Sequence, residues 1–465
     1  MEENENNKLK KFSNLQLLNF CIGFFGLQFA WQMEIILSGP VTEGLGASPF
    51  IFGLIWLAGP VTGIVVQPII GALSDNTRTR IGRRRPYMLI STLFASVALL
   101  MFPNTVKIVN YLQSFLPFQL NPLMPLILAA VMIWIIDASV NSAQGPYRAL
   151  IPDNMPKEQH SVANSFLSFA IGLGSVITAG TAPFLKWAFN IQMSVSSQFI
   201  MAALAFSLGM LWTCLTIKEV RISSEHETEK EENTVRISFA QRFKNFFAFS
   251  PEIPKICTVQ FFTWIGIMCM FIYFTQYVVH NVFGVPDLTS VSDNFRSSFQ
   301  SRLTDATNFS SVCFAIFNFI CFAVSLPIGI LSSKFGNKNI HSAALFLMAL
   351  SFFGMAFTTD TTLIKILIAV AGIGWASTLA LPFAILTKFI GKGSEGSVMG
   401  IFNMFIAAPQ ILVCTVVAWI INHSSFTVEG SIINYHFEYA LIIGALVLLI
   451  ASCATVFIKE KKSEE

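Results

Sequence analysis

The chain has 465 residues, of which 54% are hydrophobic and only 12% charged, with a net charge of +3. A charged fraction about half that of a soluble domain excludes an ordinary soluble protein, and the small net charge excludes nucleic-acid binding. The apolar residues fall in blocks of roughly twenty, long enough to cross a bilayer core of about 30 Å. Because backbone amides in lipid need partners within their own segment, we expect each block to be an α-helix.

We predict an all-α integral membrane protein with twelve spanning helices. In chain order these helices cover residues 15–39, 50–73, 87–103, 125–146, 161–186, 195–217, 256–283, 309–333, 341–358, 363–389, 397–422 and 436–458.

The basic residues fix the expected orientation. All but five of the 29 Lys and Arg residues fall in the two tails, the central loop, or the loops after spans two, four, eight and ten. Since cytoplasmic segments carry the excess of Lys and Arg, both termini are predicted to be cytoplasmic. The five exceptions are Lys107, Lys186, Arg296, Arg302 and Lys365.

The longest of these polar loops divides the chain into six spans plus six. We predict an N-terminal bundle (residues 1–217), a cytoplasmic linker (218–255) and a C-terminal bundle (256–465). The run EHETEKEEN inside the linker is typical of a solvated segment. The outer segments 104–124 and 284–308 are long enough to form short helices or lids.

Related loops follow the second span of each half. The first reads GALSDNTRTRIGRRRP and the second GILSSKFGNKN, both basic and both containing glycine. Such a repeat predicts two related bundles. The first loop resembles the loop signature of the major facilitator superfamily, in which a carboxylate and arginines bridge helix ends at a cytoplasmic gate; anchoring by positive charge alone is the alternative. The gating candidates are Asp75, Arg83, Arg84, Arg85, Arg148 and Asp153.

Longer stretches carry a closer resemblance. Span one reads GLQFAWQMEIILSGPVTEGLG, span two IWLAGPVTGIVVQPIIGALSD, span four WIIDASVNSAQGPYRALIPD and span eleven GIFNMFIAAPQILV. Together they resemble the sucrose–proton symporters of plants and their animal and bacterial relatives, within the glycoside–cation symporter group. The resemblance implies the twelve-helix facilitator fold in two six-helix bundles and proton-coupled uptake of a disaccharide or glucoside such as sucrose or maltose.

Two carboxylates lie well inside predicted spans, Asp137 in span four and Glu34 in span one. A charged group at bilayer depth is costly, so such a residue indicates function. Asn141 and Gln144 follow Asp137 at i+4 and i+7, which places all three on one helix face. The resemblance implies that Asp137 binds the coupled proton. Glu34 is a candidate for a second proton site, a sugar-hydroxyl acceptor or a gate residue, and a structural role is the alternative.

Sugar sites combine amides, which bond hydroxyls, with an aromatic face that covers the ring. The candidates on the spans that line the cavity in facilitators are Gln28, Trp31, Gln32, Asn141, Gln144, Asn164, Gln276, Trp375, Asn403 and Gln410.

Span seven departs from the plant proteins, which have an acidic, Arg-containing stretch at its end. Here the stretch reads YFTQYVVHNVFG. We interpret His280 as an interfacial histidine, with a proton-linked or sugar-binding role as the alternative. The substrate is therefore open to alternatives: a drug, a siderophore or a nucleoside. A membrane-embedded enzyme is disfavoured because no catalytic motif such as H-E-x-x-H occurs, and a non-transporting sensor is a further alternative.

We expect no enzymatic activity, and no metal or cofactor besides the coupling ion. The eight cysteines form no C-x-x-C pair, which argues against a zinc site. The proton is the expected coupling ion, with sodium left open. The expected partners are a small sugar and the lipid bilayer, with no nucleic acid. A monomer in a plasma membrane or bacterial inner membrane is predicted.

Overall fold

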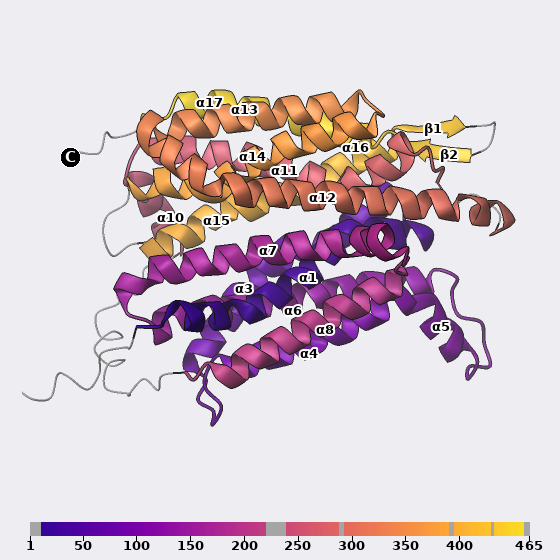
Figure 1. Cartoon of the computed structure of the whole chain (residues 1–465), viewed down its shortest axis with the longest axis horizontal. Helices are drawn as coiled ribbons and strands as arrows, with labels where there is room; N and C mark the ends of the chain where they lie inside the picture. The colour runs from indigo at the N-terminus through magenta and orange to yellow at the C-terminus, as the bar shows by residue number, and fades with distance from the viewer. Residues whose placement is uncertain (1–10, 220–238, 288–292, 390–394, 429–431, 460–465) are drawn as a thin grey trace, which may run out of the picture. The chain divides into compact units, whose positions relative to one another are not determined.

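The computed structural model describes residues 11–219, 239–287, 293–389, 395–428 and 432–459 (Figure 1). Within them, 12 helices are long and apolar enough to cross a membrane, which confirms the predicted number. They are Asn14–Gly44, Pro49–Asn76, Arg85–Gln113, Met124–Asn154, Glu158–Phe189, Val195–Thr216, Glu252–Val282, Ser297–Phe335, Asn337–Ala356, Thr361–Thr387, Ile401–Asn422 and Glu438–Val456. The acidic run 225–233 of the predicted linker lies outside the described residues.

The chain forms two compact units. The first comprises Met1–Ser38 with Val61–His226, and the second Gly39–Pro60 with Glu227–Glu465. Residues 39–60 thus cluster with the second half of the chain, although they precede most of the first unit in sequence. The division into bundles 1–217 and 256–465 joined by a linker stays a prediction, as does the cytoplasmic placement of both termini.

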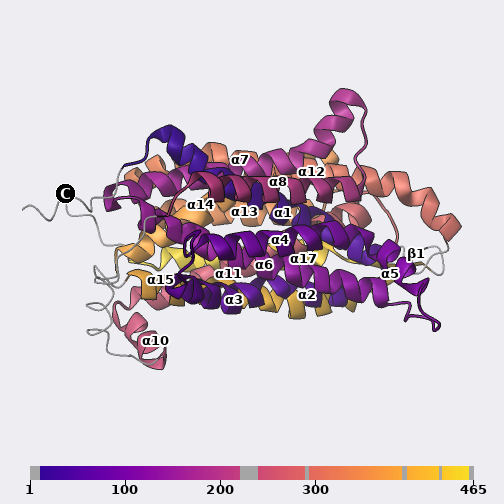
Figure 2. The same cartoon turned by 90° about the horizontal axis from the view of Figure 1, so that it is seen from below.

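The first unit is built from long helices and one short outer helix. α4 packs against both α6 and α8 (Figures 1 and 2). The predicted segment 104–124 does contain a short helix, α5. The elements are α1 (Asn14–Gly44, whose last turn belongs to the second unit), α3 (Ala58–Asn76), α4 (Arg85–Met101), η1 (Phe102–Asn104), α5 (Thr105–Gln113), α6 (Met124–Asn154), α7 (Lys157–Phe189) and α8 (Val195–Thr216).

Glycines bring α1 and α8 into close contact. A Cβ atom added at Gly26 would collide with the backbone carbonyl of Ala205, and one added at Gly209 would lie 2.8 Å from the carbonyl oxygen of Ile22. Without a hydrophobic force between helices in lipid, small residues of this kind allow the backbones to pack tightly.

The second unit contains the remaining helices and a hairpin. The elements are α2 (Pro49–Trp56), α10 (Phe239–Ala248), α11 (Glu252–Gln276), the π-helix η2 (Tyr277–Val282), α12 (Asp293–Phe335), α13 (Asn337–Ala356), α14 (Thr361–Thr387), α15 (Glu395–Leu412), the π-helix η4 (Val413–Val417), α16 (Ala418–Asn422), β1 (Ser425–Val428), β2 (Ile432–Tyr435) and α17 (Glu438–Val456). The strands pair antiparallel, with Phe426 opposite Asn434.

The two units repeat one packing scheme. α13 packs against α14 and α17, as α4 packs against α6 and α8. Gly266 of α11 and Gly444 of α17 approach each other closely, as the glycines of α1 and α8 do. The third, fourth and sixth spans of each half therefore have equivalent neighbours, and the first and sixth are joined by glycine in both. This agrees with the internal repeat expected from the two related loops.

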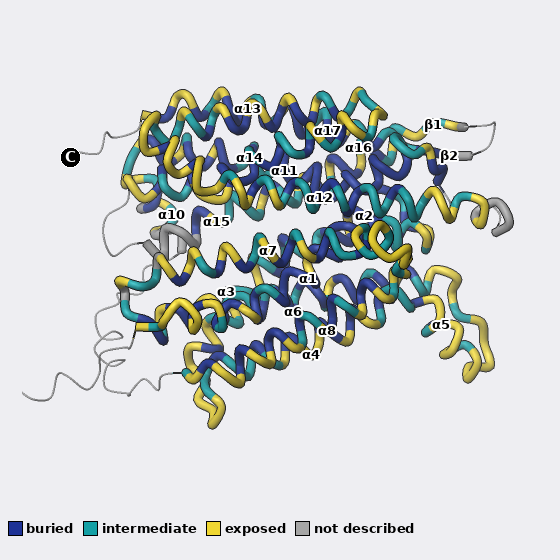
Figure 3. The backbone as a smooth tube through the Cα atoms, in the orientation of Figure 1, coloured by how far each residue is buried: buried dark blue, intermediate teal, exposed yellow. Residues whose placement is uncertain are grey.

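Exposed side chains on the spans are largely apolar. On α4 they include Leu93 and Phe94, and on α8 Leu204, Leu208 and Leu215, all at least half exposed. Figure 3 marks these outward stretches in yellow, against the dark blue of the buried faces. An apolar exterior of this kind suits lipid contact, because hydrocarbon solvates such side chains.

Candidate functional site

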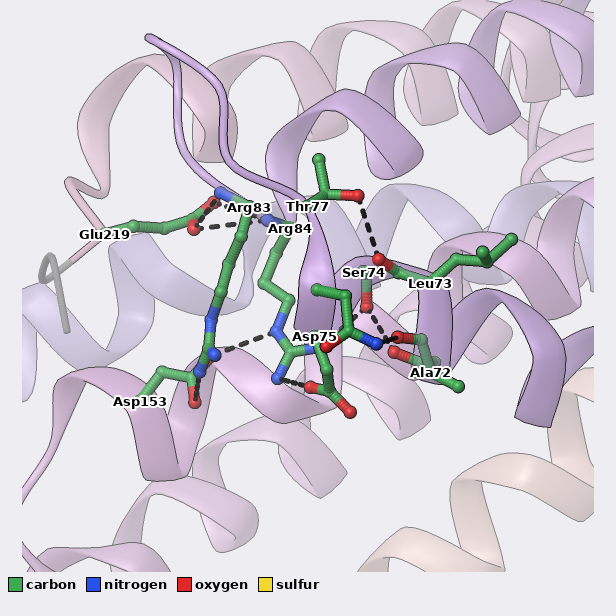
Figure 4. A network of polar contacts seen from close by, with 11 residues as sticks. Ala72, Leu73, Ser74, Asp75, Thr77, Arg83, Arg84, Asp153 and Glu219 are labelled. Atoms are coloured by element: carbon green, nitrogen blue, oxygen red, sulfur yellow. Dashed lines mark hydrogen bonds and ion pairs between the residues drawn. The ribbon is translucent and has the colours of Figure 1, made fainter. Parts of the chain in front are cut away.

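The predicted gating loop forms an ion-pair network in the first unit. It brings together the end of α3, the start of α4 and the end of α6 (Figure 4). Arg84, which is buried, donates to Asp153 (3.0 Å) and pairs with Asp75 (2.5 Å). Arg84 Nη1 also donates to the hydroxyl of Ser74 (2.7 Å). Arg83 pairs with Asp153 (2.6 Å), so two guanidinium groups share one carboxylate.

A fourth segment enters this network through Glu219, which sequence reasoning missed. The Glu219 carboxylate accepts hydrogen bonds from the backbone N–H groups of Arg83 (2.7 Å), Arg84 (3.1 Å) and Arg85 (2.9 Å). These groups are at the N-terminus of α4, where Arg84 provides no side-chain cap. Since the first N–H groups of a helix lack internal partners, Glu219 acts as a remote cap for α4.

Two gating candidates differ in their contacts. Arg85 binds Glu219 chiefly through its backbone, because its Nε lies 4.0 Å from that carboxylate. Arg148 lies on α6 with its guanidinium 5.0 Å from the centre of the Phe24 ring, as in a cation–π contact. Within the described part of the chain, the ion pairs of the loop are made by the other predicted residues and not by Arg148.

The two intramembrane carboxylates come together in the first unit. Glu34 on α1 and Asp137 near the middle of α6 are 2% and 5% exposed, and they lie close enough for each carboxyl group to influence the charge of the other. Among the described residues, neither carboxyl oxygen of Glu34 accepts a hydrogen bond. Two acidic side chains 103 positions apart in sequence therefore form one buried pair.

Further polar side chains lie on the helices that carry this pair and on their neighbours. Asn141 donates to the Thr62 hydroxyl (3.0 Å) and to the Asp137 carbonyl oxygen (3.1 Å). Gln28 accepts from the Ser175 hydroxyl (3.3 Å) on α7. These contacts join α3 to α6 and α1 to α7 by polar bonds between predicted spans. Of the other candidates on α1 and α6, Gln32 is buried, Gln144 is half-buried, and Trp31 is 36% exposed.

The remaining candidates are less alike. Asn164 is exposed on α7 and donates to the carbonyl of His160 in its own helix (2.9 Å). In the second unit, Asn403 is exposed, and Gln410 donates to the carbonyl of Ile406 (3.0 Å). Gln276 is buried against Gly39. These local contacts do not bring the four residues into one cluster.

Trp375 lies in an aromatic cluster of the second unit. Its ring centre is 5.8 Å from that of Trp264, 5.2 Å from Phe271 and 6.3 Å from Phe317. Buried polar atoms line the same helix as Trp264. Both amide atoms of Gln260, the hydroxyl of Thr263 and the indole nitrogen of Trp264 lack a partner among the described residues. Sequence reasoning missed these three residues, although their i, i+3, i+4 spacing on α11 could have indicated a shared face.

Twelve apolar helices in two units of repeated packing, with carboxyl groups buried inside the first unit, are typical of proteins that carry small solutes across membranes. The family model described as Major Facilitator Superfamily matches residues 20–412 and 303–465, and the chain belongs to this superfamily. It is accordingly a multi-pass membrane transport protein of a plasma or inner membrane and not an enzyme, as predicted.

Curated relatives match most of the chain. The general alpha-glucoside permease of Schizosaccharomyces pombe is 24% identical over 95% of this chain and 92% of its own length. Sucrose transport protein SUT2 of Oryza sativa subsp. japonica is 24% identical over 83% of each chain, and SUC4 of Arabidopsis thaliana 24% over 87% and 83%. The resemblance to the sucrose–proton symporter group, stated from the motifs, is confirmed by these matches.

Solved structures share the fold. A D-xylose-proton symporter superposes with a TM-score of 0.65 at 15% identity, covering 97% of this chain and 100% of its own. The nucleoside transporter NupG gives 0.64 at 13% identity, with 97% and 100% covered. At such identities the likeness describes the arrangement of helices alone, so the predicted facilitator fold is confirmed.

Proposed function

We propose that the protein is a proton-coupled symporter that carries a disaccharide or glucoside of the sucrose or maltose type. The observation that carries this proposal is the buried contact between Glu34 and Asp137. The named substrates of the relatives, alpha-glucosides and sucrose, support a sugar as the solute.

The carboxyl pair suits a proton as the coupling ion. Two carboxylates in contact within a dry site cannot both be charged, so the pair retains a proton. The charge of the pair can change by one when water reaches it from one side or the other. A proton taken up from one side and released to the other is the step that symport requires. The described residues place no cationic partner beside the pair, which leaves protonation as the means of neutralising it.

The polar groups around the pair suit a neutral, hydroxylated solute. Gln28, Asn141 and Thr62 provide donors and acceptors without net charge. A sugar hydroxyl can replace the weaker of their present hydrogen bonds, such as the 3.3 Å bond from Ser175 to Gln28.

The ion-pair network around Arg84 is proposed as the gate at the predicted cytoplasmic end of the first unit. Its groups come from α3, α4, α6 and the segment after α8, so they hold four helix ends together. Anchoring by positive charge would need none of the carboxylates. The matched charges of Asp75, Asp153 and Glu219 therefore favour a gating role over anchoring.

The test is uptake of labelled sucrose and maltose into proteoliposomes, with and without an imposed pH gradient. We expect accumulation against a concentration gradient when the outside is acidic. The variants Asp137→Asn and Glu34→Gln should no longer accumulate sugar, but they should still let sugar move down its concentration gradient. Glu158→Gln, which changes an exposed carboxylate of the same unit, is the control. Accumulation without a pH gradient, or full accumulation by Asp137→Asn, contradicts the proposal.

A further inference from the structure

A histidine in the second unit is buried between two hydrogen-bond acceptors. His280, on the π-helix η2, is 3% exposed. Its Nδ1 lies 2.7 Å from the carbonyl oxygen of Val285, and its Nε2 lies 2.8 and 2.9 Å from the two carboxylate oxygens of Glu43. The sequence favours an interfacial histidine at this position and leaves a proton-linked or sugar-binding role as the alternative.

These distances determine how many protons the group must hold. A backbone carbonyl only accepts, so the hydrogen bond to Val285 requires a hydrogen on Nδ1. A neutral imidazole then has a lone pair on Nε2, which faces a carboxylate that also only accepts. The contact is favourable only with one more proton, which makes His280 an imidazolium opposite an ionised Glu43.

The surroundings favour positive charge on the ring. Asp287, which is 4% exposed, adds a second carboxylate near His280, and Tyr435 of β2 lies near both carboxylates. Burial and the charges of Asp287 and Glu43 raise the pKa of the Tyr435 hydroxyl, so it remains neutral. The ring of Phe437 stacks on the imidazole at 5.1 Å with an interplanar angle of 21°.

The pair joins separate segments of the second unit. Glu43 belongs to the last turn of α1, residues 39–44, and His280 to η2. The start of η2 is fixed by the Tyr277 hydroxyl, which donates to the carbonyls of Met355 (2.5 Å) and Thr358 (2.9 Å). The backbone N–H of Asp287 donates to Ile433 of the hairpin (3.3 Å). π-Helical turns of this kind occur frequently at functional sites.

We propose that His280 and Glu43 form a second proton-binding site, distinct from Glu34 and Asp137, whose bound proton holds the last turn of α1 against η2. Loss of that proton leaves two acceptors facing each other, so the contact opens as the pH rises. The site provides a proton-dependent contact at this end of the second unit, whichever solute the protein carries. Its existence does not depend on the proposed sugar.

The direct test is solid-state NMR of the full-length protein in lipid bilayers with ¹⁵N-labelled histidine. The chain has 6 histidines, and the signal missing from His280→Gln identifies the one in question. At neutral pH both ring nitrogens of His280 should be protonated. In Glu43→Gln the amide can donate to Nε2, so His280 should become neutral. A neutral His280 ring in the wild-type protein overturns the proposal. The protonation state is read from the wild-type spectrum, so this result does not depend on the stability of a variant.

A second measurement follows the unfolding temperature of the purified protein against pH. In the wild type, the unfolding temperature should fall as the pH rises through the range in which His280 loses its proton. This fall should be missing in His280→Gln and in Glu43→Gln. In each variant the hydrogen bond is made by the amide N–H of the new Gln, which does not titrate. The control is His341→Gln, since His341 is a buried histidine of the same unit whose Nδ1 faces the Ser377 hydroxyl (2.8 Å) and not a carboxylate. Identical pH curves for the wild type and both pair variants would contradict the proposed site, even if sugar transport were established.

Discussion

Replacement of Glu219 by alanine removes the acceptor for three backbone N–H groups at the start of α4. Loss of a helix N-cap costs about 1 kcal/mol, and each part-buried donor left without a partner adds about 1 kcal/mol or more. We therefore expect Glu219→Ala to destabilise the first unit by about 2–4 kcal/mol. Glu219→Gln keeps one acceptor oxygen but loses the charge, and should cost about half as much.

The assay is thermal unfolding of the purified protein in detergent, where each kcal/mol lowers Tm by about 2–4 °C for a unit of this size. Glu158→Ala is the matched control, because Glu158 is an exposed acidic residue in the first turn of α7 and should change stability by about 0.5 kcal/mol or less. We expect the highest Tm for the wild type, an intermediate Tm for Glu219→Gln and the lowest for Glu219→Ala. Equal Tm values for Glu219→Ala and Glu158→Ala would refute the capping role.

Five further substitutions, two of them controls, test the packing and the network. Arg84→Lys cannot reach Asp75, Asp153 and Ser74 at once, and loss of one charged hydrogen bond, about 1.5 kcal/mol, should lower the initial rate of labelled sucrose uptake about tenfold. Gly26→Ala should lower Tm because its Cβ meets a backbone carbonyl, at a cost of about 1–3 kcal/mol, whereas Gly180→Ala, where the space is open, should leave Tm unchanged or higher. Trp375→Ala should lower Tm as expected for a loss of about 3–5 kcal/mol in an aromatic cluster, and Trp375→Phe should restore most of it.

The number of spans could be predicted because membrane crossing depends on local hydropathy. The ends of the spans could not be predicted in this way, because polar residues continue several helices beyond the apolar block. α1 runs past Pro40 to Gly44, and α12 begins at Asp293, inside the predicted outer segment 284–308. The hairpin β1–β2 was missed because its strands are only four residues long, Ile432–Tyr435 does not alternate, and the connection lacks the Asn-Gly or Asp-Gly pair typical of hairpins.

The candidate site was predictable where its chemistry is local. The basic loop and the carboxylate Asp75 are neighbours in sequence, and Arg84 does pair with Asp75. Glu219 and Glu43 were missed because their partners lie 135 and 237 positions away, and single charges near span ends resemble ordinary solvated residues. Contacts of this range depend on the tertiary arrangement of the helices, which hydropathy and spacing do not encode.

The central claim is tested most directly by recording sugar entry and external pH together in the same proteoliposomes. We predict that addition of sucrose or maltose makes the medium more alkaline in proportion to the sugar that enters. Asp137→Asn should admit sugar down its gradient with no change in external pH. Sugar entry through the wild-type protein with no alkalinisation would contradict proton coupling through the Glu34–Asp137 pair.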